Sequence, residues 1–177
     1  MDFEKIETGD NPPEYINAII EIPKDGSVKY ELDKNSGIMA VDRFLYTAMF
    51  YPFNYGFIPK TLAADNDPLD IIVISSMSVV PGCLLKVRVI GMLEMEDENG
   101  NDEKIISVPI NKIDAGFCDI RDINDVPKVF LDQIRHFFEN YKTLEPEKWV
   151  KLENFVNKEK ATKIVTETMI KYKEKNN

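Results

Sequence analysis

A long apolar stretch over residues 84–97 constrains the fold of this chain more than any other feature. It alternates in the way that a strand with one buried face requires. The apolar side chains that would share this face are Leu85, Val87, Val89, Leu93 and Met95. The pair Asn99-Gly100 then signals a hairpin, with residues 102–110 as the returning strand. A four-residue loop over 98–101 would place Asp97 opposite Asp102.

Two facing carboxylates in this hairpin need a compensating charge. Like charges opposite each other destabilise a sheet. At roughly 5 Å and an effective dielectric constant of about 20, their repulsion is about 3 kcal/mol. Lys104 or a bound cation could offset the repulsion of Asp97 and Asp102. Alternatively, the register slips by one residue and both acids face water at the hairpin tip.

The rest of the chain predicts more strands first and helices last. Strands are expected over Tyr15–Pro23, Val28–Asp33 and Ile71–Ser75, with a structured loop over 44–66. Helical spacing from Val126 to Tyr141 predicts one helix, and Lys158–Lys173 predicts a second. The N-cap of the first helix would be Asn124 or Asp125, with Pro127 in the first turn.

These elements predict an α+β fold, with a strongly curved antiparallel sheet or barrel and helices packed outside it. We expect residues 1–177 to form a single domain, because no linker interrupts the middle of the chain. The end segments, about 1–13 and 174–177, are predicted to be flexible.

The charge balance restricts the partners of the chain. It has 31 acidic and 22 basic residues, a net charge of −9, which argues against a nucleic-acid binder. At first sight it also argues against a polyanionic substrate. The acidic N-terminus does not resemble a signal peptide, and no apolar run could span a membrane.

The few cysteines and histidines restrict the chemistry further. Cys83 and Cys118 form no CxxC motif, and we expect buried free thiols in a reducing compartment, the cytoplasm. A single histidine, His136, excludes His-rich metal sites. Catalysis would therefore depend on carboxylates, lysines, arginine and tyrosines.

An acidic cluster precedes the strand at Ile71. Asp65, Asp67 and Asp70 lie within six residues, and Pro68 favours an extended backbone at Asp67, so that Asp65 and Asp67 could share a side. The spacing does not fit an EF-hand loop. Oxygen ligands without His or Cys suit Mg²⁺, Mn²⁺ or Ca²⁺. The alternative is a polar turn held by Asx contacts.

Basic and aromatic residues elsewhere could bind an anion. Lys29, Glu31 and Asp33 would share one face of their strand, either inside a polar barrel mouth or in water. Arginine binds phosphate through a planar fork, lysine acts as a point charge, and tyrosine adds a neutral donor. The further candidates, each consistent by itself with packing or a surface position, are Arg43, Tyr51, Tyr55, Tyr141 and Lys142.

Taken together, these segments resemble the soluble family I inorganic pyrophosphatases over about residues 15–172. The residues 65–70, Asp-Asn-Asp-Pro-Leu-Asp, match the D-x-D-P-x-D signature of that family. The other matching segments, in order, are Glu21-Ile22-Pro23, Lys29-Tyr30-Glu31, Val41-Asp42-Arg43, residues 51–59, Asp97 to Lys104, and His136-Phe137-Phe138 through Tyr141-Lys142.

The resemblance implies a fold and a reaction. The fold would be a five-stranded, OB-like closed antiparallel β-barrel with two C-terminal helices outside. The reaction would be Mg²⁺-dependent hydrolysis of pyrophosphate to two orthophosphates by a metal-activated water. Such an inorganic diphosphatase pulls pyrophosphate-releasing biosynthetic reactions forward. The resemblance also implies a homohexamer, in which His136 either lies at a subunit contact or faces solvent.

The resemblance also assigns roles to individual residues. Asp67 would orient or deprotonate the attacking water, and Tyr51 would support the site from behind. Several Mg²⁺ ions would be held, directly or through water, by Asp65, Asp70, Asp97, Asp102, Glu21 and Glu31. Phosphate groups would be bound by Lys29, Arg43, Tyr55, Lys104, Tyr141 and Lys142.

The assigned residues change what the net charge implies. Seven are acidic and four are basic, so the bare site carries −3, and two divalent cations would make it +1. The acidity therefore does not exclude a phosphate substrate. Two alternatives remain: a non-catalytic acidic module that binds a partner or cation, and a hydrolase of a different phosphoanhydride.

Overall fold

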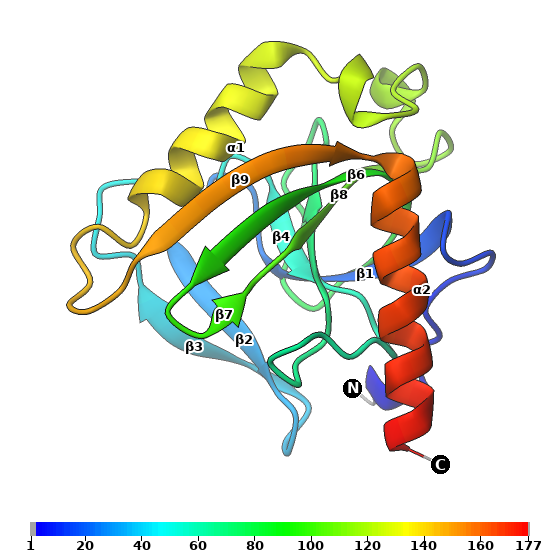
Figure 1. Ribbon diagram of the computed structural model, residues 1–177, viewed down its shortest axis with the longest axis horizontal. Coiled ribbons are helices and arrows are strands. Elements are labelled where there is room, and N and C mark those ends of the chain that lie inside the picture. Colours follow the sequence, from blue (N-terminus) through cyan, green and yellow to red (C-terminus); the bar gives the residue numbers. More distant parts are fainter. Residues whose placement is uncertain (1–2, 177) are drawn as a thin grey trace.

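Five strands close into a ring in the computed structural model, which describes residues 3–176 (Figure 1). The strands in ring order are β1 (Tyr15–Ile22), β4 (Asn54–Phe57), β5 (Asp70–Val73), β8 (Lys104–Pro109) and β6 (Leu84–Asp97), which returns to β1. This confirms the predicted closed sheet of five strands. The ring is not antiparallel throughout, as was predicted: four of its five pairings are antiparallel, but β5 pairs with β8 in parallel, because the long β6 lies between them in the chain and returns it in the same direction.

Further strands extend this framework. β9 (Val150–Asn157) and β7 (Gly100–Asn101) pair with β6, and β2 (Val28–Asp33) forms a separate hairpin with β3 (Ile38–Phe44). β3 and β9 were not predicted, and β4 lies within the segment predicted to be a loop. β4 has only four residues, all buried, and it is stabilised by strands on both sides rather than by a sequence pattern.

The side chains of β6 do not share one face along its length, so the predicted alternation is wrong beyond Val89. The pairing with β8 shifts between Val89 and Gly91, as a β-bulge does. Before the shift, Leu85 and Val89 pack in a core with α2 (Lys158–Lys175). After it, Leu93 packs in a second core with α1 (Lys128–Asn140). The bulge lets one strand contribute to both cores.

The two helices pack outside the strand ring, as predicted (Figure 1). The predicted cap of α1 is wrong: Asn124 and Asp125 belong to a separate 3-10 helix, η3 (Ile123–Asp125), and Pro127 occupies the N-cap of α1. Two further 3-10 helices are η1 (Phe3–Lys5) and η2 (Ala115–Phe117). Among the described residues, neither helix is long and apolar enough to cross a membrane.

Two other expectations concern the chain ends and the thiols. Flexibility of residues 1–13 and 174–177 stays a prediction, and residues 1, 2 and 177 lie outside the described part. Both cysteines are free, as expected, but they are not fully buried: Cys83 is exposed and Cys118 is half-buried. Cys83 lies in the turn that leads into β6, where its backbone pairs with Val80 and Ile20.

Candidate active site

A charged pocket of about 1060 Å³ lies between the β2–β3 hairpin, residues 55–70, the end of the β6–β8 hairpin and the ends of both helices. Thirteen predicted site residues line it: Glu21, Lys29, Glu31, Arg43, Tyr55, Asp65, Asp67, Asp70, Asp97, Asp102, Lys104, Tyr141 and Lys142. Tyr51 does not line the pocket. It is buried behind it, with its ring 5.8 Å from that of Tyr55.

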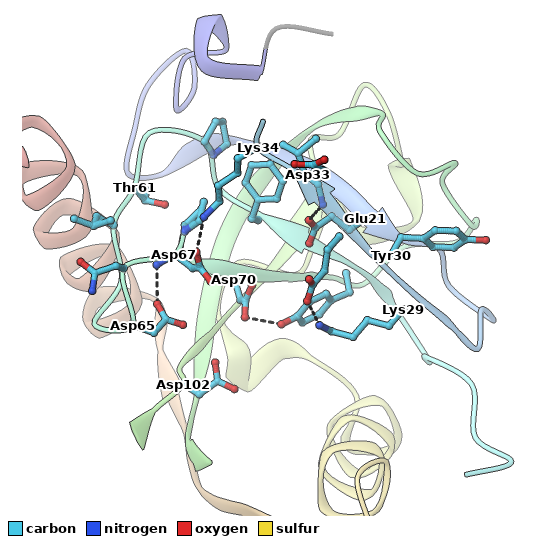
Figure 2. A pocket seen from close by; sticks show the side chains of 18 of the residues that line it. Glu21, Lys29, Tyr30, Asp33, Lys34, Thr61, Asp65, Asp67, Asp70 and Asp102 are labelled. Atoms are coloured by element: carbon cyan, nitrogen blue, oxygen red, sulfur yellow. Dashed lines mark hydrogen bonds and ion pairs between the residues drawn. The ribbon is translucent and has the colours of Figure 1, made fainter. Parts of the chain in front are cut away.

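The acidic turn presents three carboxylates to this pocket. The backbone N–H of Asp67 donates to Oδ1 of Asp65 at 2.9 Å, which is the Asx contact of the alternative interpretation. The turn is anchored by the buried Thr61, whose hydroxyl accepts from the N–H of Leu69 at 2.9 Å. Figure 2 shows Asp65, Asp67 and Asp70 facing a common space with Asp102. The polar turn and the acidic site are thus the same structure.

Lys34 is a pocket residue that sequence reasoning missed. It lies in the turn between β2 and β3, and its ammonium pairs with Oδ1 of Asp67 across the pocket (Figure 2). Both side chains are exposed, so the pair is weak and can exchange with other ions. No local pattern pointed to Lys34, because the contact joins residues 33 positions apart.

Asp70, Asp102, Lys104 and Tyr55 form a tightly coupled group. The buried ammonium of Lys104 pairs with Asp70 and Asp102, and the hydroxyl of Tyr55 donates to Oδ2 of Asp70 at 2.6 Å. Burial opposes the charge of Lys104, but the two carboxylates outweigh it and raise its pKa. Burial is also the main cause that raises the pKa of Asp102. Lys104 therefore offsets Asp102, as one of our sequence-based alternatives predicted.

The predicted facing of Asp97 and Asp102 is wrong. Asp97 pairs with Gly100, because the hairpin turns over two residues rather than four, and the N–H of Asp102 donates to the carbonyl of Met95. Asp97 is nevertheless buried and does not lie at a wet tip. Its Oδ2 accepts from Nζ of Lys142 at 2.8 Å, so each acid of the hairpin has its own lysine.

Glu98 and Lys148 add a second ion pair beside Lys142, and sequence reasoning missed both. Nζ of Lys142 lies 3.6 Å from Oε2 of Glu98, and Lys148 pairs with Oε1 of the same carboxylate. Burial opposes ionisation of Glu98, but the hydrogen bond from Lys148 and the nearby charges lower its pKa to about 2. Glu98 therefore stays ionised and holds both lysines at the pocket.

The β2–β3 hairpin places two cations side by side. Lys29 and Arg43 are direct partners in the strand register. Oδ2 of Asp42 accepts from both, at 3.2 Å from Nζ of Lys29, and Oε1 of Glu145 accepts from Nε of Arg43 at 3.2 Å. Asp42 is adjacent to Arg43 in the sequence. Glu145 lies 102 residues away from Arg43, so no local sequence pattern indicated this contact. Glu31 is exposed and pairs with Lys29.

Glu21 is the most strongly perturbed acid of the pocket. Its Oε1 accepts from the N–H of Leu32 at 2.9 Å (Figure 2). Burial, and then the negative charges of Asp70 and Glu31, raise the pKa of Glu21 to about 8 against the favourable hydrogen bond. Burial is thus the main reason why Glu21 resists ionisation, and the neighbouring acids add to it.

The acids of the pocket are spread apart rather than clustered. Within residues 3–176, no group of three or more His, Cys, Asp or Glu side chains is arranged to hold a metal ion. Ammonium groups lie against five of the seven predicted acids instead: Lys34 on Asp67, Lys104 on Asp70 and Asp102, Lys142 on Asp97, and Lys29 on Glu31. Binding of a divalent cation would exchange these contacts for metal–oxygen bonds.

The closed ring of five strands carries carboxylates, and lysine and arginine side chains of the kind that bind phosphate, around one pocket. This arrangement defines a class of protein that can bind metal cations and a small anion together. A family model described as inorganic pyrophosphatase matches residues 18–173. The chain belongs to the inorganic pyrophosphatase family.

Individual relatives agree over nearly the whole length. The inorganic pyrophosphatase of Aquifex pyrophilus is 50% identical over 173 residues, which are 98% of each chain. The structure of the Helicobacter pylori inorganic pyrophosphatase aligns with a TM-score of 0.93 at 48% identity, covering 96% of this chain and 99% of that one. The Thermus thermophilus inorganic pyrophosphatase aligns with a TM-score of 0.94 at 42% identity, covering 98% and 99%.

Proposed function

We propose that this chain is an inorganic diphosphatase, which hydrolyses pyrophosphate to two orthophosphates with Mg²⁺. Family membership over residues 18–173 carries this proposal. The pocket supports it, because seven acids and four of the cations named above line one space. A non-catalytic acidic module would need no such convergence. As a cytoplasmic enzyme it would draw pyrophosphate-releasing biosynthetic reactions forward.

Magnesium fits the donors of the pocket. All candidate ligands are carboxylate oxygens, which hard divalent cations prefer, and Mg²⁺ needs few protein ligands because it keeps several waters. Burial is the main cause that raises the pKa values of Glu21 and Asp102, and a bound cation would favour their charged forms. When bound, the ions would lower the pKa of coordinated water and neutralise phosphate charge. The proposed ligands, direct or through water, are Asp65, Asp70, Asp97, Asp102, Glu21 and Glu31.

Asp67 is the proposed catalytic residue. It would accept a proton from the attacking water, as a general base within hydrogen-bond reach does. Its exposed carboxylate is held at the pocket by the turn at Asp65 and pairs only weakly with Lys34. Because that pair is exposed, substrate and cations can displace Lys34 and free Asp67 for proton transfer.

The cations of the pocket would bind and orient the phosphate groups. Arg43 would contribute a planar fork and the lysines point charges, aimed at charge that grows on the leaving phosphate. The hydroxyls of Tyr55 and Tyr141 would donate hydrogen bonds. They stay neutral because burial raises the pKa values of both side chains well above their ordinary value. The proposed phosphate ligands are Lys29, Arg43, Tyr55, Lys104, Tyr141 and Lys142, with Tyr51 packed behind Tyr55.

A phosphate-release assay tests the proposal. With Mg²⁺, the purified protein should release orthophosphate from pyrophosphate, and a chelator should abolish the release. Asp67→Asn should lower kcat by about 10²–10⁴, the usual contribution of a general base, while binding of Mg²⁺ persists. The matched control is Asp132→Asn, which removes an exposed carboxylate on α1 outside the pocket.

Three outcomes would contradict parts of the proposal. Absence of phosphate release at saturating Mg²⁺ would exclude the activity. A near-normal rate of Asp67→Asn would exclude Asp67 as the base. Turnover of nucleoside triphosphates at a rate comparable to that of pyrophosphate would favour the alternative phosphoanhydride hydrolase.

A further inference from the structure

A second, smaller cavity lies away from the charged pocket. It has a volume of about 230 Å³ and is lined by Tyr15, Arg88, Asn111, Cys118 and Arg121. None of these residues lines the charged pocket. Arg88 lies on β6 nine positions before Asp97, so roughly 30 Å of extended strand separates the two sites. Both charged residues of the cavity lining are arginines.

The guanidinium of Arg88 is fixed without a negative partner. Its Nη1 donates to the carbonyl of Ile120 at 2.7 Å, and its Nη2 donates to the carbonyl of Phe117 at 2.8 Å. Its Nε is buried and has no hydrogen-bond partner. Among residues 3–176, Arg88 forms no ion pair with a carboxylate. Arg88 therefore contributes a positive charge that the backbone carbonyls hold in place at the cavity.

The other lining side chains offer free donors. In the described chain, the side chains of Tyr15, Asn111, Cys118 and Arg121 make no hydrogen bond. Asp125 interacts electrostatically with Arg121, but its Oδ2 already accepts the backbone N–H groups of Arg121 and Asp122, both at 2.9 Å. The cavity therefore brings together two guanidinium groups, an amide and a hydroxyl, with no acid in its lining.

We propose that this cavity is a second anion site, which binds a small inorganic oxyanion of the phosphate or sulfate class. Two arginines match such an ion in charge, and Arg121, whose side chain makes no hydrogen bond in the described chain, can offer it a planar, bidentate fork. The volume is below the 300–1,000 Å³ that is typical of sites for organic ligands, which favours a small ion over a nucleotide. In a chain with a net charge of −9, a cavity whose only charged lining residues are arginines also departs from the general surface.

Amide NMR of the metal-free protein tests this proposal without any activity measurement. A chelator removes the divalent cations that the proposed function places in the charged pocket, and the amide shifts of that pocket are followed separately from those of the second cavity. Titration with inorganic phosphate, and separately with sulfate, at constant ionic strength should give saturable shifts around Arg88, Cys118 and Arg121. Chloride at the same ionic strength should not reproduce them.

Two variants give the comparison. Arg121→Gln removes an exposed guanidinium and should weaken phosphate binding about tenfold or more, as loss of a charge-assisted hydrogen bond does. Lys163→Gln removes the same charge from an exposed position on α2 and should leave the affinity unchanged. Shifts confined to the charged pocket, or equal affinities of Arg121→Gln and Lys163→Gln, would overturn the proposal. Because no turnover is measured, neither result depends on the proposed function.

Discussion

At the residue scale, the pocket holds carboxylates of similar chemistry in opposite environments. Burial and neighbouring acids raise the pKa of Glu21 to about 8. Lys148 and Lys142 outweigh burial at Glu98 and lower its pKa to about 2. The same pocket thus contains one carboxyl that resists ionisation and another that always carries charge. This difference comes from burial and from the position of the lysines, not from residue type.

The raised pKa of Glu21 predicts a pH-dependent stability for the metal-free protein. A folded-state pKa near 8, against 4.5 in the unfolded chain, means that stability falls as pH rises from about 4.5 through 8 and then levels off. Glu21→Gln removes this loss and can keep the hydrogen bond from Leu32. In the presence of a chelator, the Tm of Glu21→Gln should exceed that of the parent protein, and the difference should grow towards pH 9. Each kcal/mol of difference in the free energy of unfolding should raise the Tm by about 2–4 °C.

Circular dichroism melts between pH 5 and 9 measure this gap. Glu167→Gln, an exposed glutamate on α2, is the control, and its Tm difference from the parent should not grow with pH. A Glu21→Gln gap that is equal at pH 5 and pH 9 would show that Glu21 ionises freely in the folded protein.

At the element scale, β6 is the strand on which the rest of the fold depends. It pairs with β1, β7, β8 and β9, and its bulges direct side chains to both hydrophobic cores. Its last residue, Asp97, enters the charged pocket. The ring closes on the other side through β4, where a close backbone approach to β1 allows only glycine.

That approach occurs at Gly56, opposite Ile20 in the register. A Cβ at this position would lie 1.8 Å from the carbonyl oxygen of Ile19, which is rigid backbone. Gly56→Ala should therefore destabilise the protein by about 3 kcal/mol or more, because the strands must separate. Gly116→Ala is the control, since its Cβ would meet Asp114 Oδ1 at 3.3 Å and needs only a small shift. Urea unfolding with similar midpoints for both variants would contradict this explanation.

At the scale of the whole molecule, large apolar side chains are exposed on and after β3. They include Ile38, Val41, Phe44, Tyr46 and Phe50, each at least half exposed. His136 is exposed on α1. The homohexamer that the resemblance implies would cover such side chains with other copies of the chain.

The proposed assembly predicts a definite mass in solution. Light scattering coupled to size exclusion should give six times the 20.4 kDa of one chain, independent of loading concentration over the micromolar range. Burial of the apolar residues should hold the assembly together in high salt, because hydrophobic association is not screened as ion pairs are. A mass of 20.4 kDa at every concentration would exclude the hexamer.

Much of the fold and of the candidate site is predictable from local sequence. The strand over residues 84–97, the helical spacing of the last third and the Asp65–Asp70 cluster are short-range patterns, and each forms the kind of structure that was expected, although the alternation of the strand holds only as far as Val89. The failures have long-range causes. β3 and β9 are stabilised by the strands with which they pair. The bulge in β6 turns the side chains that follow it toward the other hydrophobic core. The two-residue turn pairs Asp97 with Gly100 instead of Asp102.

By itself the sequence determined the residue types of the pocket, the order of most elements and the resemblance to a family, because these depend on composition and on near neighbours. Only the tertiary structure decided which lysine neutralises which acid: Lys142 on Asp97, Lys104 on Asp102 and Asp70, and Lys34 on Asp67. These pairings join residues up to 45 positions apart. Their geometry depends on how the ring closes, and closure is a property of all five strands together.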